Sequence, residues 1–270
     1  MLLLAGNVLA AEGYIIGGGV EGDSSDGVSG AVVADIGFTE KTWLSATAAY
    51  SSVDAANDQS IDSWLGDLSL DHWFDPVGLR VGVSYWGDSD VLDSNDWSAS
   101  LYWRNDKFSI AGDYEFRDFT FEIPTTDFFP GRTVEFDADG IGLTTSVELS
   151  DNVDLRFSGM AYDYDINLRL DRNRGILELL SFSRLSLINS LVDHRASAAL
   201  GVDVGERRWE LELGTWEGEV DSGTTRSATI RFLTPMGKSS DVEFGLGLDD
   251  SDLYGSVTFL SVFVYFYGGV

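Results

Sequence analysis

The 270-residue chain contains no cysteine and carries little positive charge. The absence of cysteine excludes disulfide bonds and is compatible with a protein that crosses an oxidising compartment. Lysine and arginine together number 17, against 45 aspartate and glutamate residues, which gives a formal net charge of −28. Because proteins that bind nucleic acid use lysine and arginine to neutralise phosphates, we expect no nucleic-acid partner.

Long hydrophobic runs are also missing. No stretch reaches the roughly 18 consecutive apolar residues expected of a transmembrane helix. The N-terminus, MLLLAGNVLAAEG, has a short apolar run that ends in Val8-Leu9-Ala10, a pattern typical of secretory cleavage sites, but it lacks the basic segment that normally comes first. We predict that residues 1–10 are the remnant of a signal peptide or an N-terminal tail, and that residues 11–270 form a single domain.

What the chain does contain is strict alternation of apolar and polar residues. In VGLRVGVSYW, residues 77–86, the odd-numbered residues are all apolar and the even-numbered ones include Arg80 and two glycines. A period of two is the signature of a β-strand whose two faces meet different environments. Soluble strands usually run about 5 to 6 residues, whereas a tilted membrane-spanning strand needs about 9 to 11, so this segment is long enough to span.

The same pattern recurs along the chain, and charged residues fall almost always on the polar side. Short turns that contain Asn, Asp, Gly or Pro alternate with longer, mostly acidic segments. Counting them predicts about fourteen strands, with twelve or sixteen as alternatives, and both chain ends on the side of the short turns. The predicted strands are residues 12–21, 28–38, 41–51, 63–73, 77–86, 97–104, 107–117, 140–149, 153–164, 194–204, 207–217, 226–234, 240–248 and 253–267.

The last of these segments lies in LYGSVTFLSVFVYFYGGV, which is apolar on both faces and rich in aromatic residues. With Phe263, Tyr265 and Tyr267, it resembles the closing strand of the Gram-negative outer-membrane β-barrel superfamily, which includes small porin-like channels. The resemblance implies an all-β, transmembrane, antiparallel up-and-down barrel in the bacterial outer membrane, with short periplasmic turns, long acidic extracellular loops and contacts to membrane lipid and lipopolysaccharide. A soluble β-sandwich or solenoid is the alternative, but it would not account for the alternation of short turns and long loops.

In such a barrel, the polar side of each strand would line the bore. Its mixed charges would act on polar solutes and ions, and the modest excess of acids predicts a weak preference for cations. We therefore expect a porin-like channel for passive diffusion. Ordinary salt-bridged lumen residues without a selective role, a closed or plugged structural barrel and a surface-binding barrel are the alternatives. The predicted pore-lining residues are Asp35, Asp67, Arg80, Arg104, Lys107, Asp113, Glu115, Arg117, Glu148, Asp154, Arg156, Arg195, Asp203, Glu210, Glu212, Arg231 and Glu243.

Residues 174–192, RGILELLSFSRLSLINSLV, interrupt the strand pattern. Apolar residues recur there at helical spacing, from Ile176 and Leu179 to Leu191, so we predict a loop helix of about five turns. This helix could fold into the bore or lie over it, or it could pack on the extracellular rim or on lipid.

Residues suited to catalysis or metal binding are sparse. A hydrolase of this superfamily needs a histidine with an acidic or serine partner, but His72 and His194 are predicted near opposite ends of the barrel. The acidic segment GDSDVLDSND, residues 87–96, offers oxygen ligands for calcium without the spacing of an EF-hand loop, and solvated loop charges are the simpler interpretation. We predict no catalytic site, no cofactor and no metal site.

Overall fold

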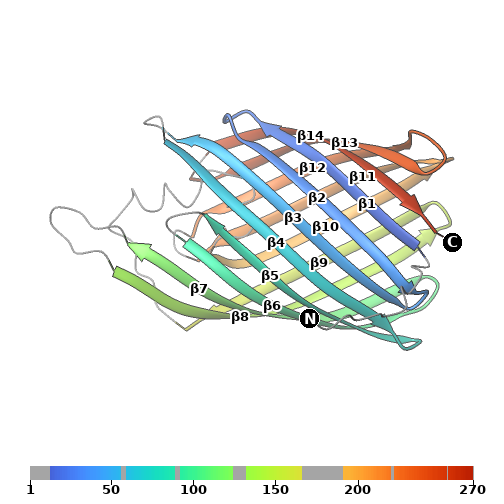
Figure 1. Cartoon of the computed structure of the whole chain (residues 1–270), viewed down its shortest axis with the longest axis horizontal. Coiled ribbons are helices and arrows are strands. Elements are labelled where there is room, and N and C mark those ends of the chain that lie inside the picture. Colours follow the sequence, from blue (N-terminus) through green and yellow to red (C-terminus); the bar gives the residue numbers. More distant parts are fainter. Residues whose placement is uncertain are drawn as a thin grey trace, which may run out of the picture.

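The computed structural model describes residues 13–55, 59–88, 92–123, 132–165, 191–219, 222–253 and 255–269. In this part of the chain every regular element is a β-strand, and each strand pairs antiparallel with the next. The last strand pairs with the first, so the sheet closes into a barrel of fourteen strands, as predicted (Figure 1). The strands are β1 (Gly13–Asp23), β2 (Val28–Thr39), β3 (Thr42–Ala55), β4 (Gln59–Trp73), β5 (Val77–Asp88), β6 (Leu92–Arg104), β7 (Phe108–Ile123), β8 (Arg132–Ser150), β9 (Val153–Tyr164), β10 (Val192–Val204), β11 (Arg207–Gly218), β12 (Thr224–Pro235), β13 (Ser240–Ser251) and β14 (Gly255–Gly268).

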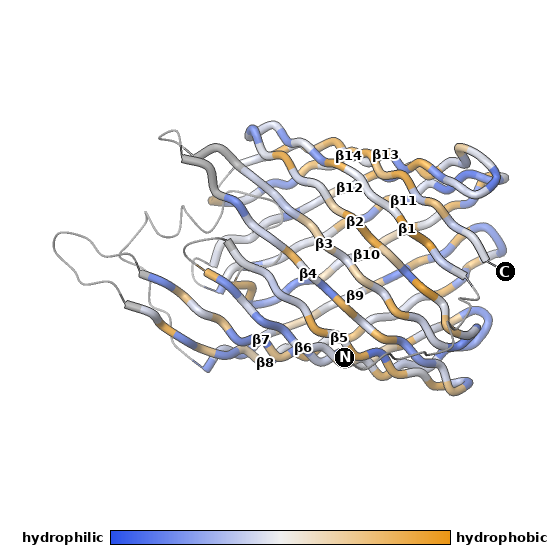
Figure 2. The backbone as a smooth tube through the Cα atoms, in the orientation of Figure 1, coloured by the Kyte–Doolittle hydropathy of each residue, from blue (hydrophilic) through white to orange (hydrophobic). Residues whose placement is uncertain are grey.

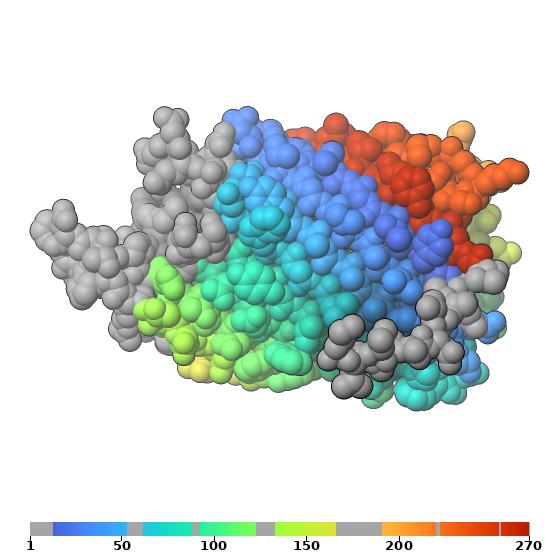
Figure 3. All heavy atoms as spheres, in the orientation of Figure 1, coloured from blue at the N-terminus to red at the C-terminus, as the bar shows by residue number. Residues whose placement is uncertain are grey.

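Closure of the barrel depends on the pairing of β1 with β14, which lie at the two ends of the chain. Their register runs from Tyr14 opposite Gly268 to Asp23 opposite Phe259. The two strands therefore lie side by side on the surface, blue beside red in Figure 3. An even number of up-and-down strands brings both ends of the barrel sequence to the side of the short turns, which is the arrangement that the sequence predicts.

The period-two pattern determines which side chains face outward. On β5, Leu79, Val81 and Val83 are exposed on the outer surface, whereas Gly82 and Trp86 of the other face are buried. Hydrophobic and hydrophilic residues alternate in the same way along the other strands (Figure 2). Residues directly opposite each other in antiparallel register point to the same side of the sheet, so the register carries this assignment around the barrel. Apolar side chains dominate the outer surface, and polar side chains dominate the interior.

The short turns form where their residues stabilise a tight reversal of the chain. Between β6 and β7, the side-chain oxygen of Asn105 accepts hydrogen bonds from the backbone N–H groups of Lys107 and Phe108, both at 2.9 Å. Asparagine is favoured in turns because its side chain can replace backbone partners in this way. Gly205, between β10 and β11, has a φ of 65°, a left-handed conformation that glycine adopts without steric cost. On this side of the barrel the predicted and observed strand ends agree to within one residue.

At the opposite end most strands are longer than predicted, although β14 begins two residues later. β6 begins at Leu92 rather than at residue 97, and β7 and β8 also continue past their predicted ends. On the outer face of this extension, Asp93 and Asn95 replace apolar residues. The contrast between the two faces therefore disappears although the backbone pairing continues. Most of the predicted long acidic loops are consequently short, apart from the connections after β7 and after β9.

The predicted helix at residues 174–192 lies outside the described residues as far as position 190. Its predicted C-terminal end is wrong, because Val192 is already the first residue of β10. No helix in the described ranges is long and apolar enough to cross a membrane. Residues 1–10, the predicted signal-peptide remnant or tail, also fall outside the described residues.

A small hydrophobic core lies inside the barrel toward the end with the long connections. Trp86, Phe119 and Phe136 are almost completely buried, and the rings of Phe119 and Phe136 stack with centroids 5.0 Å apart. Leu92 and Phe121, which are opposite each other in register, belong to the same cluster. Burying each of these large side chains contributes about 1.5 to 3 kcal/mol to stability. The core therefore stabilises the β5–β8 side of the wall and occupies part of the interior there.

Candidate functional site

Glycines on the inner wall lie beneath aromatic rings of neighbouring strands. A Cβ atom added at Gly17 of β1 would lie 2.5 Å from Cδ1 of Tyr265 on β14, which is closer than real Cβ contacts. Gly78, one of the two glycines in VGLRVGVSYW, is covered in the same way by Tyr102 of β6. A larger residue at either position would push the ring toward the barrel axis. These glycines therefore let the rings lie against the wall.

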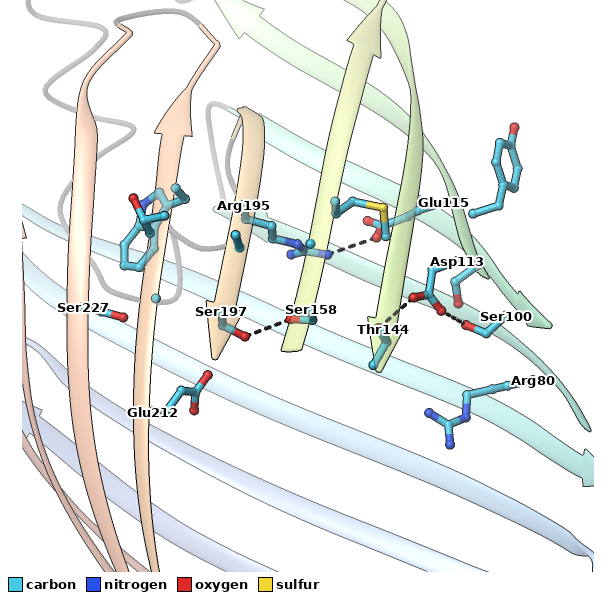
Figure 4. Close-up of a pocket in the computed structure, with 18 of the residues that line it drawn as sticks. Arg80, Ser100, Asp113, Glu115, Thr144, Ser158, Arg195, Ser197, Glu212 and Ser227 are labelled. Atoms are coloured by element: carbon cyan, nitrogen blue, oxygen red, sulfur yellow. Dashed lines mark hydrogen bonds and ion pairs between the residues drawn. The ribbon is translucent and has the colours of Figure 1, made fainter. Parts of the chain in front are cut away.

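The interior contains a cavity of about 530 Å³ that is lined by residues from β4 to β12 (Figure 4). This volume lies within the usual range for small-molecule sites. The wall is rich in hydroxyl groups, which both donate and accept hydrogen bonds. The hydroxyl-bearing residues include Ser69, Ser98, Ser100, Thr144, Ser158, Ser197, Ser227 and Thr229, and the charged residues are Asp67, Arg80, Asp113, Glu115, Arg195 and Glu212.

Asp113 of β7 is held in place by hydroxyl groups. Ser100 Oγ donates a hydrogen bond to Oδ1 at 2.5 Å, and Thr144 Oγ1 donates one to Oδ2 at 2.7 Å (Figure 4). Within the described ranges, no arginine or lysine forms an ion pair with this carboxylate. The negative charge of Asp113 is therefore oriented at the cavity wall without being neutralised by a direct cationic partner.

Arg80 of β5 is more exposed than the other arginine of the cavity. Its Nε atom lies 3.0 Å from Asp71 Oδ2, and 59% of its side chain remains exposed, compared with 36% for Arg195. Asp71 is itself held by the Tyr102 hydroxyl, which donates a hydrogen bond to Oδ1 at 2.6 Å. Arg195 pairs with Glu115, its Nη2 atom lying 3.2 Å from Oε2. Arg80 is thus anchored by one nitrogen while most of its guanidinium stays accessible.

A second charged cluster is buried beside the hydrophobic core. The Arg117 side chain is only 3% exposed, and its Nε atom lies 3.4 Å from Asp96 Oδ1 and 3.5 Å from Glu115 Oε1. The guanidinium also lies 4.6 Å from the ring centre of Phe119 and 5.6 Å from that of Tyr162. A buried charge is tolerated when it is paired and hydrogen-bonded in this way. The cluster therefore forms a fixed part of the wall.

A network of arginines and carboxylates crosses β9, β10, β11 and β12. Its contacts include 2.6 Å between Arg208 Nη2 and Asp154 Oδ2, and 2.6 Å between Arg231 Nη1 and Glu212 Oε2. Each of the three arginines contacts at least one carboxylate, so the charges largely cancel locally. The members are Arg156, Arg208, Arg231, Asp154, Asp203, Glu210 and Glu212.

Most of the predicted pore-lining residues fall into these groups. Arg117 belongs to the buried cluster, and Glu212 belongs to both the cavity and the network. The predicted residues on the cavity wall are Asp67, Arg80, Asp113, Glu115, Arg195 and Glu212, and those in the network are Asp154, Arg156, Asp203, Glu210, Glu212 and Arg231.

The remaining predicted residues lie apart from the cavity. Asp35, Glu148 and Glu243 are on the inner side of β2, β8 and β13, as judged from their register partners. Arg104 lies over the ring of Trp73, 4.1 Å from its centre, near the short turns. Lys107, predicted as a strand residue, instead lies in the turn between β6 and β7, since the Asn105 side chain bonds its backbone and ends the strand pairing there.

The sequence pattern alone did not identify Asp96 as an interior residue. Residues 87–96 are predicted as a loop, but Asp96 belongs to β6 and lies opposite Arg117 of β7. The signal that could have revealed it is the continued alternation of Ser94 and Asp96 with Ser98, all on one side of the strand. Among the described residues, no group of three or more His, Asp or Glu side chains could hold a metal ion.

His72 of β4 and His194 of β10 lie near opposite ends of the barrel, as predicted. His72 Nδ1 lies 2.7 Å from Thr42 Oγ1 beside the short turns, and His194 Nδ1 lies 2.6 Å from Asp193 Oδ2 near the other end. Glu219 follows the end of β11 close to this second pair. Burial, together with the neighbouring Asp193 carboxylate, raises the pKa of Glu219 above its ordinary value.

These features define a closed antiparallel barrel with an apolar exterior and a polar, charged interior. No family model and no curated protein matches the chain. Among solved structures, the chain is similar to the CymD monoaromatic hydrocarbon channel, with 10% identity and a TM-score of 0.58 over 96% of this chain and 89% of that one. It is also similar to the TodX deltaS2S3 mutant monoaromatic hydrocarbon channel, with 7% identity and a TM-score of 0.53 over 97% and 91% of the two chains. A third similar structure is OccAB1 of Acinetobacter baumannii, with 10% identity and a TM-score of 0.50 over 96% of each chain. At these identities the similarity establishes the fold alone, a closed barrel that this chain shares with these structures.

Proposed function

We propose that this barrel is a porin-like channel of the bacterial outer membrane through which small polar solutes or ions diffuse passively. The observation that carries the proposal is the hydroxyl-rich cavity of about 530 Å³ inside a closed barrel with an apolar exterior. Barrels of about eight strands are filled by their own side chains, whereas those of about sixteen or more leave an aqueous channel. A barrel of fourteen strands lies between these two sizes, and its aromatic rings lie over glycines of the wall, so a narrow aqueous path fits inside it.

We also propose a weak preference for cations. The cavity wall carries four carboxylates, Asp67, Asp113, Glu115 and Glu212, against the two arginines Arg80 and Arg195. Fixed charges of one sign along a narrow bore raise the local concentration of mobile ions of the opposite sign. Because two of these four carboxylates, Glu115 and Glu212, are already paired with arginine, the remaining bias is modest.

The test is single-channel recording from the refolded barrel in a planar bilayer. Steady openings are expected. Under a salt gradient, the reversal potential of the current should lie closer to the equilibrium potential of the cation than to that of the anion. A folded barrel that inserts and conducts nothing would contradict the proposal.

A closed structural or surface-binding barrel is the second candidate function. It is favoured by the hydrophobic core around Trp86 and Phe119 and by the buried Arg117 cluster, which together occupy interior space on the β5–β8 side. In that case the long connections, placed outside the cell, would carry the function by binding a partner. The same recordings distinguish the two candidates, because a closed barrel gives no steady openings.

We further infer that this barrel is not a hydrolase. The two histidines contact Thr42 and Asp193 at opposite ends of the structure, so they do not meet in one catalytic arrangement. The named structural neighbours reported above include two hydrocarbon channels. The apolar exterior would contact membrane lipid, and its rim would contact lipopolysaccharide.

A further inference from the structure

One row of side chains crosses three neighbouring strands at the cavity wall. Arg80 of β5 lies opposite Ser100 of β6, and Ser100 lies opposite Asp113 of β7. Residues in such a row point to the same side of the sheet, so a cation, a hydroxyl and an anion line the cavity next to one another (Figure 4).

Arg80 has hydrogen-bond donors to spare. A guanidinium carries five N–H donors in a planar fork. Among the residues that the structure describes, the ion-pair partner of Arg80 is Asp71, which contacts Nε. The rest of the guanidinium is directed into the open cavity in Figure 4. This is the donor geometry that binds a carboxylate through two parallel hydrogen bonds.

Asp113 has acceptor capacity to spare. An ionised carboxylate offers about four lone-pair sites, and the hydroxyls of Ser100 and Thr144 occupy one on each oxygen. Since these donors are neutral, they orient the carboxylate without cancelling its charge. The remaining positions suit a cationic donor such as an ammonium group.

We propose that Arg80 and Asp113 together bind a small zwitterion, a solute that carries one carboxylate and one ammonium group. The carboxylate pairs with Arg80 and the ammonium group pairs with Asp113, while hydroxyls of the opposite wall, such as those of Ser227 and Thr229, contact the rest of the solute or its water. A solute with a single charge leaves one of the two groups unmatched. The proposal rests on the proposed channel function, because the solute must reach the cavity through the bore.

The test compares zwitterions with analogues that lack one charge. Glycine and 4-aminobutanoate supply a short and a longer charge separation, and butanoate and butylamine each supply one charge. Affinities are measured by calorimetric titration of the refolded barrel in detergent. At least one zwitterion should bind about tenfold more tightly than either single-charge analogue, because it adds one charge-assisted hydrogen-bonding contact.

Two variants separate the two halves of the site. Arg80→Gln should remove the advantage of the zwitterion over butylamine, and Asp113→Asn should remove its advantage over butanoate. Arg226→Gln is the matched control, because Arg226 lies outside the cavity and its side chain is 65% exposed, paired with Asp252. This control should keep the wild-type order of affinities.

The outcomes distinguish the binding site from the channel. If neither zwitterion binds more tightly than its single-charge analogues, or if both variants keep the preference, the zwitterion site is wrong. Uptake of butane-1,4-diol, which carries no charge, into vesicles containing the barrel tests the channel independently. Uptake of the diol without any zwitterion preference overturns this inference alone, whereas zwitterion binding without uptake of diol or ions overturns the channel and leaves the binding site standing.

Discussion

Arg117 Nε and Asp96 Oδ1 lie 3.4 Å apart inside the barrel, and both side chains are less than a tenth exposed. The two residues are also direct register partners on β7 and β6. Glu115 completes the cluster, with Oε1 3.5 Å from the same Nε atom. The ion pair thus joins two neighbouring strands beside the hydrophobic core, since the Arg117 guanidinium lies 4.6 Å from the ring centre of Phe119.

Replacing Arg117 by methionine should destabilise the barrel strongly. The substitution leaves Asp96 buried without its cation, whereas Glu115 keeps its pair with Arg195, and breaking a buried pair in this way costs about 3 to 5 kcal/mol. The measurement is the free energy of unfolding in urea, from vesicles. Arg226→Met is the control, because its pair with Asp252 is more than half exposed and should contribute at most about 1 kcal/mol. If both variants lose the same free energy of unfolding, burial of the Arg117 pair does not make it more important for stability than an exposed pair.

Replacing Gly17 by valine should narrow the bore. The new Cβ would collide with the Tyr265 ring, at 2.5 Å from Cδ1, and displace it inward. We expect a lower single-channel conductance. Gly18→Val is the matched control on the same strand, because Gly18 is on the outer face and the nearest atom to its added Cβ is a backbone oxygen at 3.4 Å. A wild-type conductance for Gly17→Val would contradict the view that the glycine keeps the ring against the wall.

The sequence predicts this fold well because each membrane-length strand has one apolar and one polar face. The segment VGLRVGVSYW shows this directly, and the observed β5 runs from Val77 to Asp88, two residues beyond the predicted end. The short turns are also well predicted, since residues such as Asn105 specify a turn through their own side-chain chemistry.

The site is less predictable, because it depends on register between strands. Nothing in a single strand shows that Tyr102 covers Gly78, or that Ser100 separates Arg80 from Asp113. The strand ends at the opposite side from the short turns are hard to predict from the sequence for a different reason. There the outer face becomes polar, so an interior residue in that region looks like part of an acidic loop.

Introducing arginine at Val83 and at Ser84 should have different consequences. Val83 is on the outer surface and Ser84 is on the inner one, one residue apart on β5. An outward arginine near the middle of a bilayer costs about 2 to 4 kcal/mol. At Ser84 the new guanidinium would approach Asp96, whose Oδ2 lies 3.5 Å from Ser84 Oγ, and the cost should be smaller. Unfolding from lipid vesicles measures both variants, and equal costs would argue against lipid at the outer face.

Glu219 should make the barrel less stable as the pH rises. Burial, with the Asp193 carboxylate nearby, raises the pKa of Glu219 in the folded state above that in the unfolded chain, so ionisation is less favourable after folding. Its destabilising effect is absent below the ordinary glutamate pKa and is fully present above the raised value. Glu219→Gln should therefore increase stability relative to the wild type at neutral pH and not in acid. A gain that is equal at both pH values would indicate a cause other than ionisation.

Arg231 and Glu212 should shift ion selectivity in opposite directions. Arg231 Nη1 lies 2.9 Å from Glu210 Oε1 and 2.6 Å from Glu212 Oε2. Its loss removes the cation that faces Glu212, whereas Glu210 keeps its contacts with Arg156 and Arg208. Arg231→Gln should therefore strengthen the preference for cations, whereas Glu212→Gln, which removes one carboxylate from the cavity wall, should weaken it. Reversal potentials under a salt gradient measure both effects, with Arg226→Gln as a control outside the bore. If the two variants move the reversal potential in the same direction, or leave it unchanged, these interior charges do not act on the permeating ions.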